Sequence, residues 1–308
     1  MDFTVYLPVA GNAVNVFLLL GLGGGVGFLS GLFGVGGGFL MTPLLIMIGV
    51  PPVVAAGSDS NQIVAASTSG TFAHSRAGSV DFKMGILLFS GGILGGTVGV
   101  FLIKLLREMG EADLLIHLTY VVMLGSIGSY MFVESLQGLR GRRHVHAPSG
   151  RRSLYARVVD ALPWKTEFPR SGITLSPIVP VALGTFVGVL AAIMGVGGGF
   201  IMIPVMVYLL RMPMHVVVGT SLFQILFTCI HVTILQSTVN RAVDVVLALL
   251  LLIGSVIGAQ IGAKASRRLN ADQLKIFMAI VVLAVMTKML FGLISTPSAL
   301  VAYTGGHS

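Results

Sequence analysis

Long apolar runs, interrupted by clusters of glycine, dominate this sequence. Residues 14–50 and 177–210 contain no Asp, Glu, Lys or Arg. The further apolar runs fall near residues 53–73, 84–103, 114–133, 216–239, 245–263 and 276–294. Because a bilayer core of roughly 30 Å needs about 20 apolar residues per helical span, the pattern predicts an all-α polytopic membrane protein with about 8–10 membrane segments.

The two runs without charge contain nearly the same glycine-rich segment. Residues 34–43 read GVGGGFLMTP, and residues 195–204 read GVGGGFIMIP. Such clusters break a helix, and in lipid a break is tolerated only where it is buried in protein or lines a cavity. Two matching breaks in two halves of a chain are typical of the binding site of a secondary transporter. The sequence therefore predicts Gly-broken helices at the centre of such a site.

Other landmarks return in the same order in the second half. Val80-Asp81 returns as Val243-Asp244, and the spaced glycines of 91–99 return at 254–262. The polar stretch GSDSNQ at 57–62 has the counterpart GTSLFQ at 219–224. This order indicates an internal duplication. We therefore divide the chain into a first transmembrane repeat (1–137), a basic loop (138–175) and a second transmembrane repeat (176–308).

The distribution of charge predicts the topology. Of the 19 Lys and Arg residues, which give a net charge of +8, eight lie in the loop 138–175. Such a loop is typical of the cytoplasmic side of an inner membrane protein, and it argues against a nucleic-acid partner. With this loop in the cytoplasm, 15 Lys and Arg residues lie inside and three outside, and both termini lie outside. Each half crosses the membrane an odd number of times, so the two repeats are expected to be inverted.

One alternative stays open in this topology. Residues 14–50 form either two short spans or a re-entrant helical hairpin, and 177–210 offer the same choice. Loop charges do not separate the two, because both place every later loop on the same side.

Composition excludes several other classes of protein. The chain is 55% apolar and only 10% charged, with a mean hydropathy of +0.96, which is unlike a soluble domain. Its single cysteine, Cys229, excludes an intramolecular disulfide and a cysteine metal cluster. The glycine segment is neither a Walker nor a Rossmann motif. We expect no metal, no cofactor, no catalytic residue and no enzymatic activity, and the sequence leaves a homodimer open.

The broken helices are the candidate anion site. The N-terminus of a helix carries partial positive charge and free N–H donors, so it can bind an oxyanion without a cationic side chain. Neutral side chains at matching places in the two halves are expected to add further donors. The predicted substrate-binding residues are Gly36, Gly37, Gly38, Ser58, Asn61, Gln62, Gly197, Gly198, Gly199, Thr220, Ser221 and Gln224. The alternative is that the glycines only permit tight helix crossing and the polar groups only join helices.

Asp59 allows two interpretations. A carboxylate inside a membrane span is functional by default, which favours coupling to a proton or a cation. Alternatively, Asp59 caps a helix that begins after Pro51-Pro52. His231 lies in the second-half counterpart of this helix, where a lone histidine is more often part of the packed core.

The doubled G-V-G-G-G-F motif, the V-D loop and the G-x-x-x-G-x-x-x-G helix resemble the TauE/SafE family. The resemblance covers roughly residues 14–294, and it includes 192–195 (AIMG) and 162–165 (LPWK). It implies a permease for sulfur-containing anions, known in the family as sulfite exporters. One stretch departs from the pattern, because 58–62 (SDSNQ) replaces the simpler Gly219-Thr220-Ser221-Leu222 arrangement of the second half.

We therefore expect a secondary transporter of a small sulfur-containing oxyanion such as sulfite or an organosulfonate, and the resemblance implies that it is an exporter. The partners are that anion and the lipid bilayer. The alternatives are an anion channel and an intramembrane enzyme that uses Asp59 or His231.

Overall fold

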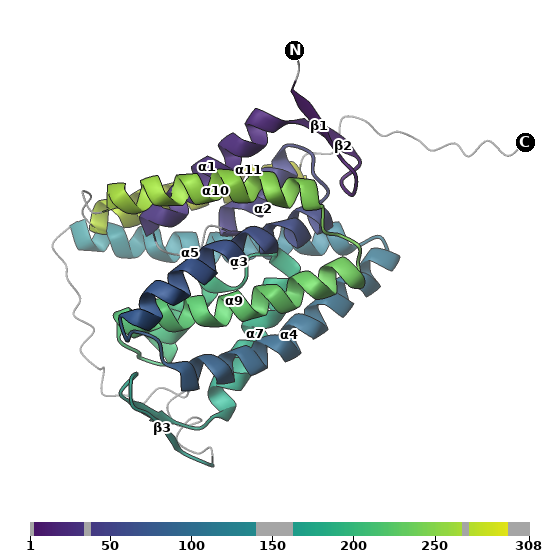
Figure 1. Ribbon diagram of the computed structural model, residues 1–308. Helices are drawn as coiled ribbons and strands as arrows, with labels where there is room; N and C mark the ends of the chain where they lie inside the picture. Colours follow the sequence, from purple (N-terminus) through teal and green to yellow (C-terminus); the bar gives the residue numbers. More distant parts are fainter. Residues whose placement is uncertain (1–2, 34–37, 140–162, 267–270, 295–308) are drawn as a thin grey trace, which may run out of the picture.

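The computed structural model describes residues 3–33, 38–139, 163–266 and 271–294, and over them the predicted helical fold is confirmed (Figure 1). Each half begins with a β-hairpin and continues in helices. The first half contains β1 (Thr4–Leu7), β2 (Asn12–Asn15), α1 (Val16–Phe33), α2 (Gly38–Met47), α3 (Pro52–Arg76), α4 (Phe82–Glu108) and α5 (Ala112–Leu139). The second half contains β3 (Thr166–Phe168), β4 (Ile173–Leu175), α7 (Ile178–Met194), α8 (Gly199–Pro204), η1 (Val205–Leu209), α9 (Met214–Thr238), α10 (Val245–Ser266) and α11 (Ala271–Ile294).

The two hairpins were not predicted from the sequence. Both are antiparallel, and each turns through a glycine in the left-handed region, Gly11 (φ 70°) and Gly172 (φ 66°). In each turn the glycine N–H donates to the carbonyl four residues earlier, on Leu7 or Phe168. The second hairpin lies within the segment 138–175 that we assigned to a loop. The duplication therefore extends to the strands that precede the helices.

Helices of the first half pack against helices of the second half. Helix α4 packs along α7, and α10 packs along α1. The spaced glycines lie at these crossings: a Cβ on Gly95 would lie 1.9 Å from the Thr185 carbonyl oxygen, and a Cβ on Gly258 would lie 2.0 Å from that of Gly24. No side chain fits at such distances, so glycine is required for the approach of the two backbones.

The equivalent helices α3 and α9 lie side by side at the centre, and α5 pairs with α11 (Figure 1). Gly57 at the start of α3 approaches Ala242 beyond the end of α9, whereas Gly70 near the end of α3 approaches Leu222. The two helices are therefore antiparallel, and a two-fold axis that relates them is perpendicular to their length. Inverted repeats remain a prediction, which this packing supports.

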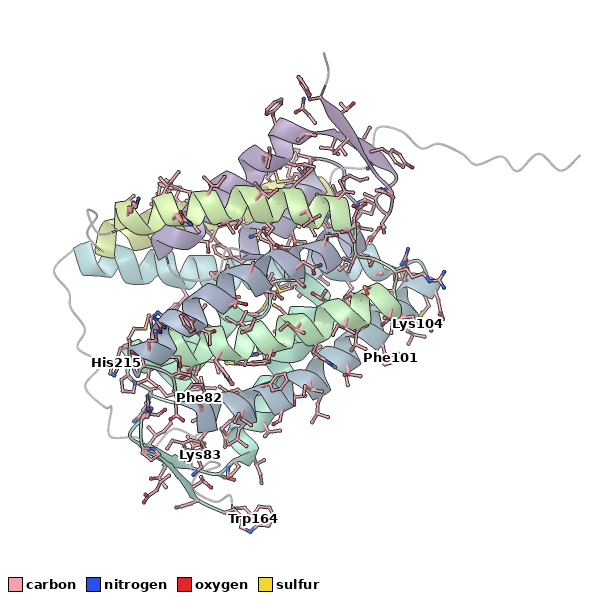
Figure 2. The ribbon with its side chains drawn as sticks, in the orientation of Figure 1. Phe82, Lys83, Phe101, Lys104, Trp164 and His215 are labelled. Atoms are coloured by element: carbon pink, nitrogen blue, oxygen red, sulfur yellow. The ribbon has the colours of Figure 1, made fainter. Side chains whose placement is uncertain are left out.

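Among the described residues, four helices are long and apolar enough to cross a membrane: Phe82–Glu108, Ala112–Tyr130, Met214–Thr238 and Val245–Gly262. Their outer faces carry exposed apolar side chains such as Leu94 and Phe101 on α4, between Lys83 and Lys104 near its two ends (Figure 2). A lipid environment accounts for such a surface. Helix α2 has 10 residues and spans about 15 Å, which is too short for a full crossing.

The short helical segment of the second half, which consists of α8 and η1, is one residue longer than its counterpart in the first half. After Pro43 the first half runs to Gly49, whereas the second half needs residues 205–211 to reach the same place. The structure places the additional residue in η1, a π-helical turn that follows α8 without interruption. A π-helix accommodates one more residue per turn than an α-helix, and such turns are frequent at functional sites.

Candidate functional site

The helix break of the second half is built on glycine conformations. Helix α7 ends at Met194, and Gly195, Gly197 and Gly198 follow with φ of 71°, 68° and 77°. Residues with a side chain rarely adopt this region. A Cβ on Gly195 would also lie 2.1 Å from the carbonyl oxygen of Ala56 on α3. The break predicted at the second glycine cluster is confirmed, and it presses directly on α3.

In the first half, the predicted residues Gly36 and Gly37 lie outside the described residues, and Gly38 begins α2. A Cβ on Gly38 would lie 2.3 Å from the Ile63 Cδ1 atom and 3.3 Å from the Val196 Cα atom. The start of α2 is therefore in contact with the break between α7 and α8.

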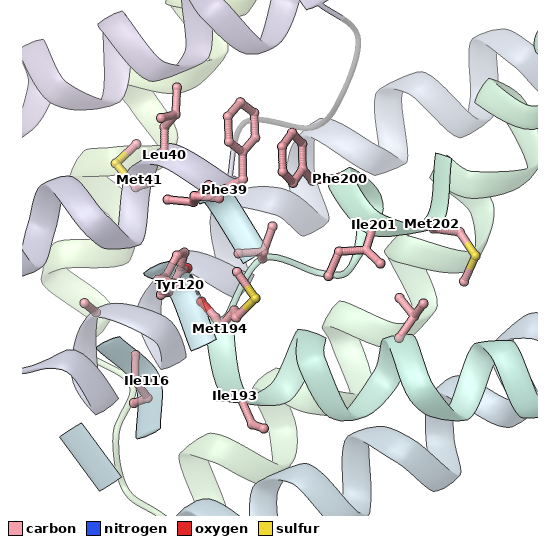
Figure 3. Close-up of a cluster of buried hydrophobic side chains, with 14 of the residues drawn as sticks. Phe39, Leu40, Met41, Ile116, Tyr120, Ile193, Met194, Phe200, Ile201 and Met202 are labelled. Atoms are coloured by element: carbon pink, nitrogen blue, oxygen red, sulfur yellow. Dashed lines mark hydrogen bonds between the residues drawn. The ribbon is translucent and has the colours of Figure 1, made fainter. Parts of the chain in front are cut away.

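The two copies of the motif meet at the centre of the molecule. Phe39 and Phe200, which occupy the same motif position, stack with ring centroids 4.5 Å apart and planes 10° from parallel. Both are buried, and Figure 3 shows them face to face above Tyr120 and Met194. Equivalent residues touch in this way only close to the axis that relates the halves. The N-terminal ends of α2 and α8 consequently converge there.

The carbonyl end of α7 is held from two sides. The Ser60 hydroxyl donates to the Gly195 carbonyl oxygen at 3.2 Å, and the Tyr120 hydroxyl donates to that of Met194 (Figure 3). Ser60 belongs to α3 and Tyr120 to α5, so two helices of the first half donate hydrogen bonds to the end of α7 in the second half. No motif or spacing in the sequence predicts this role of Tyr120.

Asp59 lies two turns inside α3, which begins at Pro52, and its side chain is fully buried. Its Oδ2 atom accepts a hydrogen bond from the Thr42 hydroxyl of α2 at 2.9 Å, and its Oδ1 atom has no partner. The helix-cap interpretation is therefore wrong, because a cap would bond to backbone N–H groups at the helix start. In the second half, Ser221 occupies the position that corresponds to Asp59, and Ile203 occupies the position that corresponds to Thr42.

Two of the predicted substrate-binding hydroxyls hold the halves together. Ser58 Oγ accepts from the backbone N–H of Asp244 at 2.9 Å, and Thr220 Oγ1 accepts from that of Asp81 at 3.0 Å. Ser221 donates to the Val218 carbonyl of its own helix at 3.0 Å. A role of these three hydroxyls in substrate binding stays a prediction. In the structure, Ser58 and Thr220 join the two halves, and Ser221 bonds within its own helix.

The aspartates of the two V-D loops each cap a helix and anchor a hairpin. Asp81 Oδ1 accepts from the N–H of Met84 at the start of α4, and Asp244 Oδ1 accepts from that of Leu247 at the start of α10. Their Oδ2 atoms accept from the Ser171 hydroxyl at 2.6 Å and from the Val9 N–H at 2.9 Å. Each hairpin is thereby attached to a helix of the other half. This accounts for the V-D motif at both places.

The predicted amides retain unused hydrogen-bonding atoms. Asn61 Nδ2, Gln62 Oε1 and Gln224 Oε1 are buried without a partner, while Gln224 Nε2 donates to Thr228 Oγ1 at 2.9 Å. A buried polar atom without a partner is costly, so each is an attachment point for a ligand or water. They lie on α3 and α9, the central helices that the start of α2 and the break between α7 and α8 contact.

Cys229 is buried beside Gly197, whose added Cβ would lie 2.4 Å from the sulfur atom. His231 is half-buried, and its Nε2 atom lies 2.9 Å from Thr97 Oγ1 on α4. The described part of the chain contains no group of three His, Cys, Asp or Glu side chains that could hold a metal ion. Neither residue thus forms part of a metal centre among the described residues.

Comparisons with known proteins find membrane transporters along most of the chain. The family model described as "Sulfite exporter TauE/SafE" matches residues 19–289. The probable membrane transporter protein YunE of Bacillus subtilis is 25% identical over 94% of this chain and 98% of its own length. YjnA of the same bacterium, with the same description, is 28% identical over 84% of this chain and 93% of its own. A probable membrane transporter protein of Xylella fastidiosa is 27% identical over 84% of this chain and 88% of its own. No solved structure matches the chain.

Proposed function

The chain belongs to the TauE/SafE family of membrane transporters, and from this premise we propose that it is a secondary transporter of a small sulfur-containing oxyanion. Sulfite and organosulfonates are the candidate substrates. The direction we propose is export across the cytoplasmic membrane. Export of an anion is favoured by a membrane potential that is negative inside, by about 2.3 kcal/mol per charge for each 100 mV.

The convergence of the two helix breaks is the observation that carries this proposal. Helices α2 and α8 both begin where Phe39 stacks on Phe200, and α8 is extended by η1. Their N-terminal ends place two regions of partial positive charge and free N–H groups together. The main-chain groups at Gly38 and at 197–199 would bind the oxyanion there. The glycines leave no side chain between the backbone and the ligand.

The remaining contacts would come from neutral amides on the central helices. Asn61 Nδ2 is a buried donor without a partner. The unpaired atoms of Gln62 and Gln224 are amide oxygens on the same pair of helices, and these would accept from a protonated oxygen of the substrate or from a bridging water. Neutral donors bind an anion without the strong attraction of Lys or Arg. A site of this kind releases its substrate readily, as transport requires.

Alternating access would follow from the inverted repeats. We propose that the loop 138–175 faces the cytoplasm and that both termini lie outside. The crossing of α4 on α7 and that of α10 on α1 are equivalent contacts at opposite sides of α3 and α9. Exchange of their geometries would open the central site first to one side of the membrane and then to the other.

Flux through proteoliposomes tests the proposal. Purified protein is reconstituted, and release of sulfite, thiosulfate, sulfoacetate and methanesulfonate is compared with release of chloride and acetate. We expect saturable release of at least one sulfur oxyanion and none of acetate. Release equal to that from empty liposomes for every anion contradicts the proposal, and release that does not saturate indicates a channel.

Variants of the site sharpen the same assay. Asn61→Leu should abolish most of the flux while leaving the protein folded, because the amide donor has no partner to lose. Thr238→Val is the matched control, since this exposed hydroxyl bonds only to carbonyls of its own helix. Normal flux from Asn61→Leu and from Gly197→Ala, at equal protein level, would place the substrate elsewhere.

A further inference from the structure

We infer that the Asp59 carboxyl is a proton-carrying site, present once per molecule, which binds a proton together with the transported anion. The inference rests on the proposed function, and it names the second ion that the same site handles.

No cationic group compensates the Asp59 carboxylate among the described residues. Helix α2 contributes the Thr42 hydroxyl. On α5 and α9 the titratable groups beside the break between α7 and α8 are Tyr120, which bonds to the Met194 carbonyl, and Cys229, which lies beside Gly197, and neither is a cationic residue. Helix α7 contains no titratable residue, and the one at the near end of α10 is Asp244, a second carboxylate, which is reached through Ser58. An ionised carboxylate surrounded by neutral or acidic groups in an apolar interior is strongly disfavoured relative to the protonated acid. A proton relieves this cost without any further ligand.

The partial charges of the helix ends around Asp59 also favour its protonated form. Ser60, the residue after Asp59, touches the last turn of α7 through the Gly195 carbonyl, and Tyr120 touches it through Met194. The C-terminal end of a helix carries partial negative charge, which disfavours a carboxylate and favours a proton or a cation. The N-terminal ends of α2 and α8 favour the anion instead. In transporters with broken helices, coupling ions occupy the carbonyl ends of half-helices in this way.

The hydrogen bonds also connect this carboxyl to both breaks. Thr42 lies in the helix that follows the first glycine cluster, and Asp59 accepts its hydroxyl. Ser60 and Tyr120 reach the end of the helix that precedes the second cluster. A change of charge on Asp59 thereby acts on α2 directly and on α7 through α3.

The sign of the coupling follows from electrostatics. An oxyanion at the helix breaks is repelled by ionised Asp59 and is not repelled by the protonated acid. The anion therefore binds more tightly to the protonated form, and anion binding takes up a proton. Proton and anion then move in the same direction, so one proton cancels one charge of the anion, and the membrane potential favours export only of a divalent anion such as thiosulfate. Apparent affinity falls by up to about tenfold per pH unit where the carboxyl is ionised.

The second half lacks this site. Ser221 stands in place of Asp59, and Ile203 stands in place of Thr42. One proton per transport cycle is the resulting stoichiometry.

The first experiment needs no substrate. Infrared difference spectra of reconstituted protein should show the carbonyl stretch of a protonated carboxylic acid that disappears in Asp59→Asn. Asp59→Ser, which installs the second-half residue, serves the same purpose should Asp59→Asn fold poorly. If wild type and both variants show no difference in this band, the carboxyl is ionised and the inference is overturned.

The second experiment measures coupling with thiosulfate and methanesulfonate, whose charges are constant between about pH 6 and pH 8. An inward-directed proton gradient should accelerate uptake of the transported probe in the wild type and not in Asp59→Asn. Thr238→Val should respond as the wild type does. An identical response of wild type and Asp59→Asn, or a requirement for Na⁺ in place of the proton, overturns the inference. Lack of flux for every anion refutes the proposed function alone, because the infrared result stands without it.

Discussion

The two halves of this protein share a scaffold and differ in the chemistry at its centre. In both, a hairpin precedes the helices, an aspartate caps the fourth helix, and a hydroxyl holds the backbone of the opposite aspartate. Near the helix breaks the two halves differ, because Thr42 and Asp59 of the first half correspond in sequence to Ile203 and Ser221 of the second. Residues that fit both halves build the frame, and those that differ identify the candidate for coupling.

This comparison divides polar residues that look alike in the sequence. Ser58 and Asp59 are neighbours, both fully buried, in the same polar stretch. Ser58 has a counterpart of the same function in Thr220, whereas Asp59 has none. Ser58 and Thr220 are thus explained by assembly of the halves, because each bonds to the backbone of the other half, whereas Asp59 calls for a functional explanation.

The largest expected effect tests the shared frame at the helix crossings. Gly95→Ala and Gly258→Ala each place a Cβ within 2.0 Å of a backbone carbonyl oxygen, so each should destabilise the protein by about 3 kcal/mol or more. Thermal unfolding of purified protein, followed by size-exclusion chromatography, measures the loss. Gly25→Ala on α1, where a Cβ meets nothing within 4 Å, is the control. If one of the two crossings tolerates alanine, the halves are not equivalent there.

A smaller effect is expected at the hairpin anchors. Asp81→Ala and Asp244→Ala each remove a helix cap and the hydrogen bond to a hairpin, and each should cost about 2 kcal/mol. The two losses should be similar, because each aspartate caps its helix and bonds to a hairpin of the other half, through the Ser171 hydroxyl or the Val9 N–H. Thermal unfolding of both variants under one condition checks this. A large loss from only one of them would show that the two hairpins contribute unequally.

The frame could be predicted further than the contacts that complete it. Apolar runs and the doubled motif predict helices, duplication and central breaks, because both signals are local in the sequence. Tyr120 and its bond to the end of α7 could not be predicted, since the bond joins residues 74 positions apart. The hairpins were missed because strands of three or four residues leave almost no periodic pattern.

The additional residue of the second half can be detected in the sequence, although its place in a π-helix cannot. The distance between matching landmarks increases from 161 at the glycine motif to 162 at the polar stretch, which requires one additional residue between Pro204 and Gly219. The length of the repeat alone does not say whether that residue lengthens a loop or enters a helix. The structure places it in η1, beside the break.

The smallest effect concerns two positions where the halves adopt the same backbone with different residues. Gly49 and Arg211 end the short helices of the two halves in the left-handed region, with φ of 92° and 56°. Arginine is strained there by about 1 kcal/mol, so Arg211→Gly should stabilise the protein by nearly that amount, less the entropy that glycine gains in the unfolded chain. Arg211→Asn, which tolerates this region and removes the same charge, should fall between glycine and arginine. Gly49→Ala should destabilise by a similar amount, and this change isolates the backbone because no atom lies within 4 Å of the added Cβ. Thermal unfolding of the three variants measures these changes in stability. If both Arg211→Gly and Gly49→Ala are less stable than the wild type, the Arg211 side chain contributes more stability than its backbone strain costs. The ends of the two short helices would then be stabilised by different interactions.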